Sequence, residues 1–243
     1  MKKFFIIICF LPIYNGCDSG GESQLPAPGR VMMVPRSHDT AAIEQGIDAV
    51  PESDGIILQW YDLRDPGVRY YDIYRQNENE TYFRKIRRID LETAFPGSDT
   101  VYIDDSEDLV LKRYNYYYVK AVNRDGLEGS ASDTVKYMLL LKAETTRPDG
   151  SVQGMPVLYW SFPAGDIPNF YLVRIEEEFT NRLILSRKFA VTDFFEMQEL
   201  DLSQLENPPQ FILNFSYRWR LDSVGPDSLF SGSESQWRIF TAQ

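Results

Sequence analysis

The sequence repeats itself at the scale of a domain, and this constrains its fold more than any single segment does. Three landmarks keep their order and nearly their spacing, 100 to 102 positions apart: Leu58-Gln59-Trp60 with Leu158-Tyr159-Trp160, Tyr71–Arg75 with Tyr171–Ile175, and Tyr117–Val122 with Trp219–Val224. A period of this length is typical of two homologous domains rather than of a solenoid of small units. Each repeat is long enough to build a modest core of its own.

Short runs rich in β-branched and aromatic residues make up each repeat. In the first repeat they are Ile56–Trp60, Tyr71–Arg75, Val101–Ile103 and Tyr116–Val122, and Gly, Asp, Asn and Pro separate them. This composition, bounded by breaker residues, is typical of strands. Long 3.6-residue periodicity is missing, so the predicted fold class is all-β, with each repeat a β-sandwich.

At these landmarks the chain resembles tandem fibronectin type III domains. The family signature of a Trp, a Tyr-rich strand and a later aromatic strand is matched by Trp60, Tyr71–Arg75 and Val119–Asn123, and again by Trp160, Tyr171–Ile175 and Tyr217–Val224. The resemblance covers nearly all of residues 26–243 and implies two immunoglobulin-like sandwiches. It implies little about the ligand, because such folds carry many functions.

The corner tyrosine of that family has a counterpart only in the second repeat. Tyr217 stands at its position there, whereas the first repeat has Asn115, flanked by Tyr114 and Tyr116. Either a bulge re-aims Tyr114 into the corner, or the first domain lacks this feature.

The chain begins with a leader of the kind that exported proteins carry. Two lysines precede the apolar Phe4–Ile13, which is about half the length that a spanning helix needs. Cys17 follows, and the leader resembles a bacterial lipoprotein signal, which implies cleavage before Cys17 and lipidation of its thiol. Tyr14 and Asn15 depart from that family's pattern, so an ordinary cleaved signal is the alternative.

Cysteine usage favours the lipoprotein interpretation. The only other cysteine, Cys9, lies inside the leader, and an exported chain with one unmodified thiol is unusual. The predicted organisation is a signal peptide (1–16), a flexible tether (17–25), a first domain (26–141) and a second domain (142–243). With little linker between the domains, a stiff rod is expected. We expect an exported protein, held at the bacterial cell membrane by the lipid alone.

The net charge and the residue types limit the possible functions. A net charge of −11 opposes binding to nucleic acid or to an anionic lipid surface. His38 is the only histidine, so a hydrolytic triad or a zinc site is not expected, and no phosphate-binding or dinucleotide motif occurs. The composition does not exclude a glycosidase that uses a pair of carboxylates, since acidic residues are plentiful, although such an enzyme needs a deep cleft. We therefore expect no enzyme, cofactor or metal.

Strand alternation predicts an aromatic surface on the first domain. If Tyr71 and Ile73 point inward, then Tyr70 and Tyr74 point outward, and neighbouring outward positions hold Tyr116 and Tyr118. Such a face could bind an envelope or extracellular protein, or stack on the sugar rings of a polysaccharide. The structural alternative is that these pairs only stabilise the sheet.

The same alternation predicts an outward arginine stripe on the second domain, formed by Arg174, Arg218 and Arg220. It could receive an acidic partner, or its members could pair with Glu176, Asp222 and neighbouring acids. Glu176-Glu177-Glu178 is expected to be the exposed end of a strand.

Two acidic or polar segments of the first domain have alternative interpretations. Arg36–Gly55 is longer than the connection between two strands needs, and is either a split first strand, with Ile43 and Ile47 covering the sandwich edge, or a recognition loop. Asp104–Asp108 offers closely spaced oxygens, but lacks the spacing of a calcium loop and is expected to be a solvated turn.

Overall fold

The structure, a computed structural model, describes residues 24–95, 97, 99–162, 168–191, 197–226 and 231–243. Cys17, the predicted signal peptide and most of the predicted tether lie outside these residues. Strands and loops make up the described chain, apart from one short 3-10 helix, η1 (Leu202–Gln204). The all-β prediction is confirmed. In the described part, no helix has the length and apolar character to cross a bilayer.

The first sandwich packs two sheets face to face. One sheet holds β1 (Met32–Met33) and β2 (Asp48–Ala49), both paired with β3 (Ile56–Tyr61), which also pairs with β6 (Val101–Asp104). The other runs in the order β5 (Arg84–Asp90), β4 (Val68–Asn77), β7 (Tyr114–Asn123) and β8 (Val135–Leu139).

The second sandwich repeats this arrangement. Its smaller sheet has the order β14 (Gln198–Asp201), β11 (Val157–Ser161) and β9 (Glu144–Arg147). In its larger sheet β13 (Leu183–Ala190) pairs with β12 (Phe170–Glu177), which pairs with β15 (Ser216–Val224). The far edge of β15 is shared by β16 (Ser231–Glu234) and β17 (Arg238–Ala242), and β10 (Gly150–Val152) pairs with β17. Both sandwiches thus have the strand order of a fibronectin type III-like fold.

The sequence landmarks occupy equivalent places in two separate cores. Trp60 and Trp160 are both buried, and each contacts a strand tyrosine, Tyr71 at a ring distance of 5.6 Å and Tyr171 at 4.9 Å. The predicted inward residues of β4 and β7 are buried in the first core, and those of β12 and β15 in the second. Alternation therefore predicted the core face of the central strands correctly.

The corner position differs between the domains, as the sequence indicates. In the second, the Tyr217 hydroxyl accepts a hydrogen bond from the backbone N–H of Ile212 at 2.8 Å. In the first, the buried Asn115 amide takes over this role and donates to the carbonyls of Val110 and Arg113 at 3.3 and 3.2 Å. An amide thus ties the same corner that a phenol ties in the repeat.

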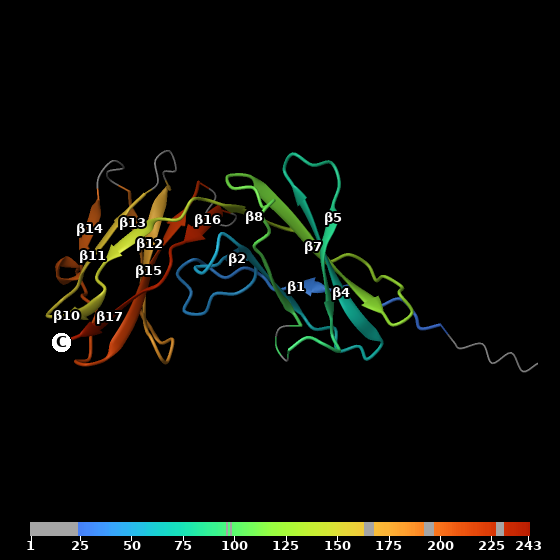
Figure 1. Ribbon diagram of the computed structural model, residues 1–243, viewed down its shortest axis with the longest axis horizontal. Helices are drawn as coiled ribbons and strands as arrows, with labels where there is room; N and C mark the ends of the chain where they lie inside the picture. Colours follow the sequence, from blue (N-terminus) through green and yellow to red (C-terminus); the bar gives the residue numbers. More distant parts are fainter. Residues whose placement is uncertain (1–23, 96, 98, 163–167, 192–196, 227–230) are drawn as a thin grey trace, which may run out of the picture.

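The two sandwiches lie end to end and share one continuous sheet (Figure 1). β8 of the first pairs in parallel with β16 of the second, with Met138 opposite Ser231 and Leu139 opposite Gly232. The Leu140 N–H also donates to the Gly232 carbonyl at 3.0 Å. This strand pairing, in place of a flexible linker, holds the domains at a joint.

Residues 36–46 form a second element of the joint, and we call them the 36–46 segment. The first strand is split around it into β1 and β2, and Ile47 is buried, as one interpretation predicted. The prediction that Ile43 covers the sandwich edge is wrong, because Ile43 is 78% exposed. Instead the segment reaches across to the second sandwich (Figure 1).

Candidate functional site

The predicted tyrosine face lies on the outer surface of β4 and β7. Tyr74 of β4 pairs directly with Tyr118 of β7. Tyr70 lies earlier on β4, opposite Val122, and Tyr116 of β7 pairs with Gln76 of β4. All four side chains are partly exposed, and none is among the fully buried residues. They are therefore available on the surface of the first sandwich.

Ring stacking gives this face its shape. Tyr74 and Tyr118 stack at 4.7 Å with an interplanar angle of 19°, and Phe83 contacts Tyr118 at 4.7 Å. Lys120 lies 5.6 Å from the Tyr74 ring centre, and the Tyr74 hydroxyl donates to Glu128 at 3.0 Å. Partial burial, together with Glu128, raises the pKa of Tyr74 above its usual value. The two stacked rings thus already have neighbours on their faces.

The ends of the tyrosine face combine aromatic rings with cations. Tyr70 lies beneath two guanidinium groups, those of Arg69 at 5.4 Å and Arg88 at 4.6 Å. Tyr116 contacts the ring of Tyr114 at 6.3 Å. Tyrosine and arginine are the residue types that most often dominate the binding energy of protein interfaces.

A groove of about 490 Å³ opens beside Tyr116. Its apolar wall comes from the chain around β1 and from the start of β8, with Met33, Pro35, Ile47 and Val135 among its lining residues. The groove therefore extends the tyrosine face around the edge of the sandwich, next to the first residues of the 36–46 segment.

The predicted outward arginine stripe is largely not at the surface. Arg174 is 2% exposed and Arg220 is 3% exposed, because the 36–46 segment covers them. Arg174 donates to the carbonyls of Ala41 and Ala42 at 2.9 and 2.7 Å. Only Arg218 keeps a partly exposed side chain, which packs over Trp237. As a free docking surface for an acidic partner, the stripe is therefore a wrong prediction for Arg174 and Arg220.

The alternative prediction, that these arginines pair with neighbouring acids, is confirmed. Glu176 accepts from Arg174 at 2.7 Å and from Arg218 at 2.6 Å, and these two arginines hold its pKa below the usual value despite burial. The expectation that the glutamate run is exposed is wrong for Glu176 and Glu177, which are both buried.

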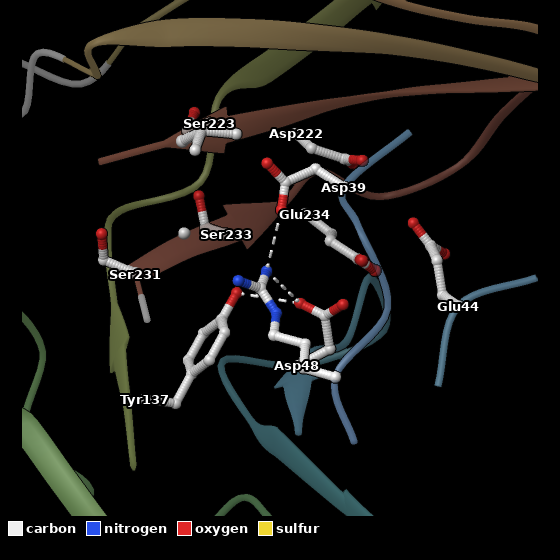
Figure 2. Close-up of a pocket in the computed structure, with 12 residues that line it drawn as sticks. Asp39, Glu44, Asp48, Tyr137, Asp222, Ser223, Ser231, Ser233 and Glu234 are labelled. Atoms are coloured by element: carbon white, nitrogen blue, oxygen red, sulfur yellow. Dashed lines mark hydrogen bonds and ion pairs between the residues drawn. The ribbon is translucent and has the colours of Figure 1, made fainter. Parts of the chain in front are cut away.

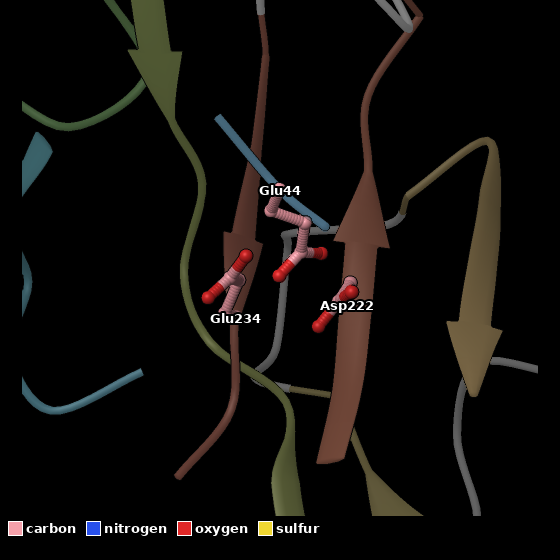
Figure 3. Close-up of side chains that lie close together, drawn as sticks. All are labelled: Glu44, Asp222 and Glu234. Carbon is pink, nitrogen blue, oxygen red and sulfur yellow. The ribbon is translucent and has the colours of Figure 1, made fainter. Parts of the chain in front are cut away.

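At the centre of the joint, the carboxylates of Glu44, Asp222 and Glu234 come together from different elements (Figure 3), and Arg220 pairs with all three. It contacts Glu44 of the 36–46 segment at 2.7 Å, Asp222 of β15 at 2.8 Å and Glu234 of β16 at 2.7 Å. Carboxylate oxygens of the three acids lie within 4.8 Å of one another. The guanidinium of Arg220 pairs with all three acids, so the cluster already contains a cation. We call these four residues the joint cluster.

Burial dominates the protonation of the joint cluster. It raises the pKa of Asp222 to about 7 and that of Glu234 well above its usual value, even though Arg220 opposes both shifts. Burial alone would lower the pKa of Arg220, but the three carboxylates outweigh it and hold that pKa well above its usual value. Arg220 is thus permanently charged, while the two buried acids are ready to take up a proton.

A second ion network of the joint lies beside the first (Figure 2). Arg36 pairs with Asp39 at 3.4 Å and with Asp48 at 3.1 Å, and the Tyr137 hydroxyl donates to Asp48 at 3.0 Å. The cavity that these residues line together with the three acids of the joint cluster measures about 20 Å³, room for roughly one water molecule. It is too small to receive a substrate.

The acidic run of the first domain also surrounds an arginine. Arg75, on β4, is fully buried and contacts Asp104 at 2.6 Å, the Ser106 hydroxyl at 2.7 Å and Asp108. The prediction of a merely solvated turn is wrong for Asp104, which is fully buried. Strand alternation already placed Arg75 inward after Tyr71 and Ile73, and this was the signal for a buried ion pair.

The remaining predicted residues have no role in these sites. His38 is exposed on the 36–46 segment. Cys17 lies outside the described residues, so its lipidation stays a prediction. The residues that sequence reasoning missed are Arg36, Glu44 and Glu234. Glu44 pairs with Arg174 and Arg220 of the other domain, whereas Arg36 and Glu234 pair within their own domains.

No protein-family model matches the sequence, and no curated protein matches it. Among solved structures, the chain is similar to the FN1–FN3 domains of chicken CNTN1, with 12% identity over 89% of this chain and 67% of that chain, at a TM-score of 0.32. It is also similar to a structure described as a myokine, with 17% identity over 46% of this chain and 97% of that one, at a TM-score of 0.31. The fold assignment rests on the strand arrangement itself.

Proposed function

We propose that the protein is a non-catalytic, lipid-anchored scaffold of the bacterial cell envelope, which binds another envelope or extracellular protein through the tyrosine face. The observation that carries this proposal is the tyrosine face itself, with its paired rings, flanking arginines and adjoining groove. Stiff aromatic side chains beside cations provide large contact area at a low entropic cost. The joint supports a scaffold role, because paired strands keep the two domains in a fixed relation.

Ring geometry favours a protein over a polysaccharide as the partner. A sugar platform needs an aromatic ring with one open face, but Tyr74 and Tyr118 stack on each other and are flanked by Lys120 and Phe83. Polysaccharide pull-down of the chain and of its Tyr74/Tyr118 double alanine variant separates the two partners. Equal retention of both proteins would speak against sugar binding at this face.

Photo-crosslinking tests the protein partner. With a benzophenone amino acid at Tyr116, we expect a discrete crosslinked species in cells that make the protein, because this ring borders the groove. Tyr61 is the matched control, since it is an exposed tyrosine of the same domain on the opposite sheet. Equal crosslinking from both positions, or none from Tyr116, would contradict the proposed surface.

Metabolic labelling with a palmitate analogue tests the anchor. Cys17→Ser is expected to abolish labelling, because the only other cysteine lies in the segment that cleavage removes. Cys9→Ser, the matched control, is expected to keep it. Labelling that persists in Cys17→Ser would show that the anchor is wrong, while the fold and the tyrosine face would be unaffected.

A further inference from the structure

Two acids of the joint cluster are direct neighbours on adjacent strands. Asp222 of β15 and Glu234 of β16 are cross-strand partners, so their side chains lie on the same face of the sheet. Like charges at directly opposite positions destabilise a strand pair. Both side chains are also buried, which prevents water from screening the repulsion.

Cations compensate these two acids incompletely. Among the described residues, Arg220 is the only cation that forms an ion pair with either acid. Glu44 shares the same guanidinium and has a second contact to Arg174 at 3.3 Å. One guanidinium therefore pairs with two buried carboxylates that have no other cation among the described residues. A single proton bound by the two acids would neutralise the remaining negative charge.

The other charged groups around the pair are already paired or point elsewhere. Glu176 is held by Arg174 and Arg218, Asp39 by Arg36 and Lys188, and Asp48 by Arg36 and the Tyr137 hydroxyl. Lys142, between the domains, donates to the carbonyls of Val50 and Pro51 at 2.5 and 3.0 Å, and burial lowers its pKa. None of these neighbours supplies the missing positive charge by direct contact.

The acid pair acts on the strand that connects the domains. β16 carries Glu234 at one end and, at the other, the residues that pair with Met138 and Leu139 of β8. Ser233 also donates from β16 to the Leu141 carbonyl at 2.9 Å. Asp222 and Glu234 lie on adjacent strands (Figure 3), so repulsion between them, when both are ionised, would act on the strand by which the second sandwich contacts the first.

We propose that the joint is a proton-dependent lock, closed when Asp222 and Glu234 share a proton and loosened when that proton is lost. An acid whose pKa is raised in the closed state stabilises that state below the pKa of the open state, near 4, and this stabilisation is lost as pH rises through the closed-state pKa. The joint thus tightens in mildly acidic surroundings and loosens in alkaline ones. In the loosened state each sandwich keeps its own core.

Hydrogen exchange of the full-length chain tests the lock. The probe is the Leu140 amide, which donates to Gly232 across the joint, and the reference is the Val119 amide in the first core. Between pH 5.5 and 8.5, after correction for intrinsic exchange, we expect protection of Leu140 to fall at least about tenfold relative to Val119. A constant ratio would overturn the proposal.

Substitutions identify the groups responsible. Asp222→Asn and Glu234→Gln each remove one negative charge at nearly constant shape, so each is expected to flatten the pH dependence and keep the joint protected at pH 8.5. Asp72→Asn is the matched control, because Asp72 is an equally buried acid that pairs with Lys85 and Arg88 away from the joint. If both joint variants keep the wild-type pH dependence, or if Asp72→Asn abolishes it, the lock is wrong. Two independent joint variants keep the test decisive should one of them fail to fold.

Discussion

Replacing Arg220 with alanine is expected to lower the free energy of unfolding of the second sandwich by about 3–5 kcal/mol at pH 8, which is the usual cost of removing one partner from a buried ion cluster. The guanidinium is 3% exposed and contacts Glu44, Asp222 and Glu234. Without it, three carboxylates would face one another in a site that water barely reaches. Urea unfolding followed by tryptophan fluorescence measures the loss.

The loss in free energy of unfolding caused by Arg220→Ala is expected to be smaller at pH 5 than at pH 8. Burial raises the pKa of Asp222 and of Glu234 in the folded chain, and the loss of Arg220 raises both further. Protonation at the lower pH then removes the uncompensated charges. A deficit of equal size at both pH values would show that packing, rather than charge, accounts for the effect.

Arg218→Ala is the matched control for this prediction. Arg218 lies on the same strand and face, two residues earlier, but its side chain is 27% exposed and its acid, Glu176, keeps Arg174 as a second partner. A cost of about 1 kcal/mol or less is expected, as for a partly exposed pair. Equal losses in the two variants would contradict the central role of Arg220.

Sequence reasoning succeeded where a residue's environment is local. Alternation along Tyr71–Arg75 and Tyr117–Val122 identified the core-facing residues, because successive side chains of a strand point to opposite faces. The 100-residue repeat identified equivalent strands, because homologous domains keep similar short segments at equivalent positions. Both signals can be recognised from short segments of the sequence, without knowing what packs against them.

Sequence reasoning failed where distant segments meet. Alternation correctly assigned Arg174 and Arg220 to the outer face of their sheet, but it contains no information about what covers that face. The cover is the 36–46 segment, more than 130 positions away. The unusual length of that connection was the one local signal that it had a partner, and nothing in the pattern identified the partner.

The ion cluster of the first domain supports a prediction of equal size. Arg75→Ala is expected to lower the free energy of unfolding of the first sandwich by about 3–5 kcal/mol, because it leaves Asp104 as a buried carboxylate without its cation. The Tyr117 hydroxyl, which donates to Asp104 at 2.8 Å, would remain as a neutral donor and compensates only part of that charge. Urea unfolding again measures the loss.

Arg87→Ala separates the buried pair from a general effect of removing positive charge. Arg87 lies exposed on β5, next to the strand that carries Arg75, and its loss is expected to change stability by no more than about 0.5 kcal/mol.

The pH dependence of stability also distinguishes Arg75→Ala from Arg220→Ala. Arg75 lowers the pKa of Asp108, so the stability that this contact contributes is present above the unfolded-state pKa of an aspartate and is lost only in stronger acid. Arg75→Ala should therefore weaken the acid-side dependence of stability, whereas Arg220→Ala is most damaging on the alkaline side. Each of the two buried arginines stabilises its own domain through ion pairs with carboxylates. Arg75 pairs with Asp108, whose pKa is lowered, whereas Arg220 pairs with Asp222 and Glu234, whose pKa values are raised.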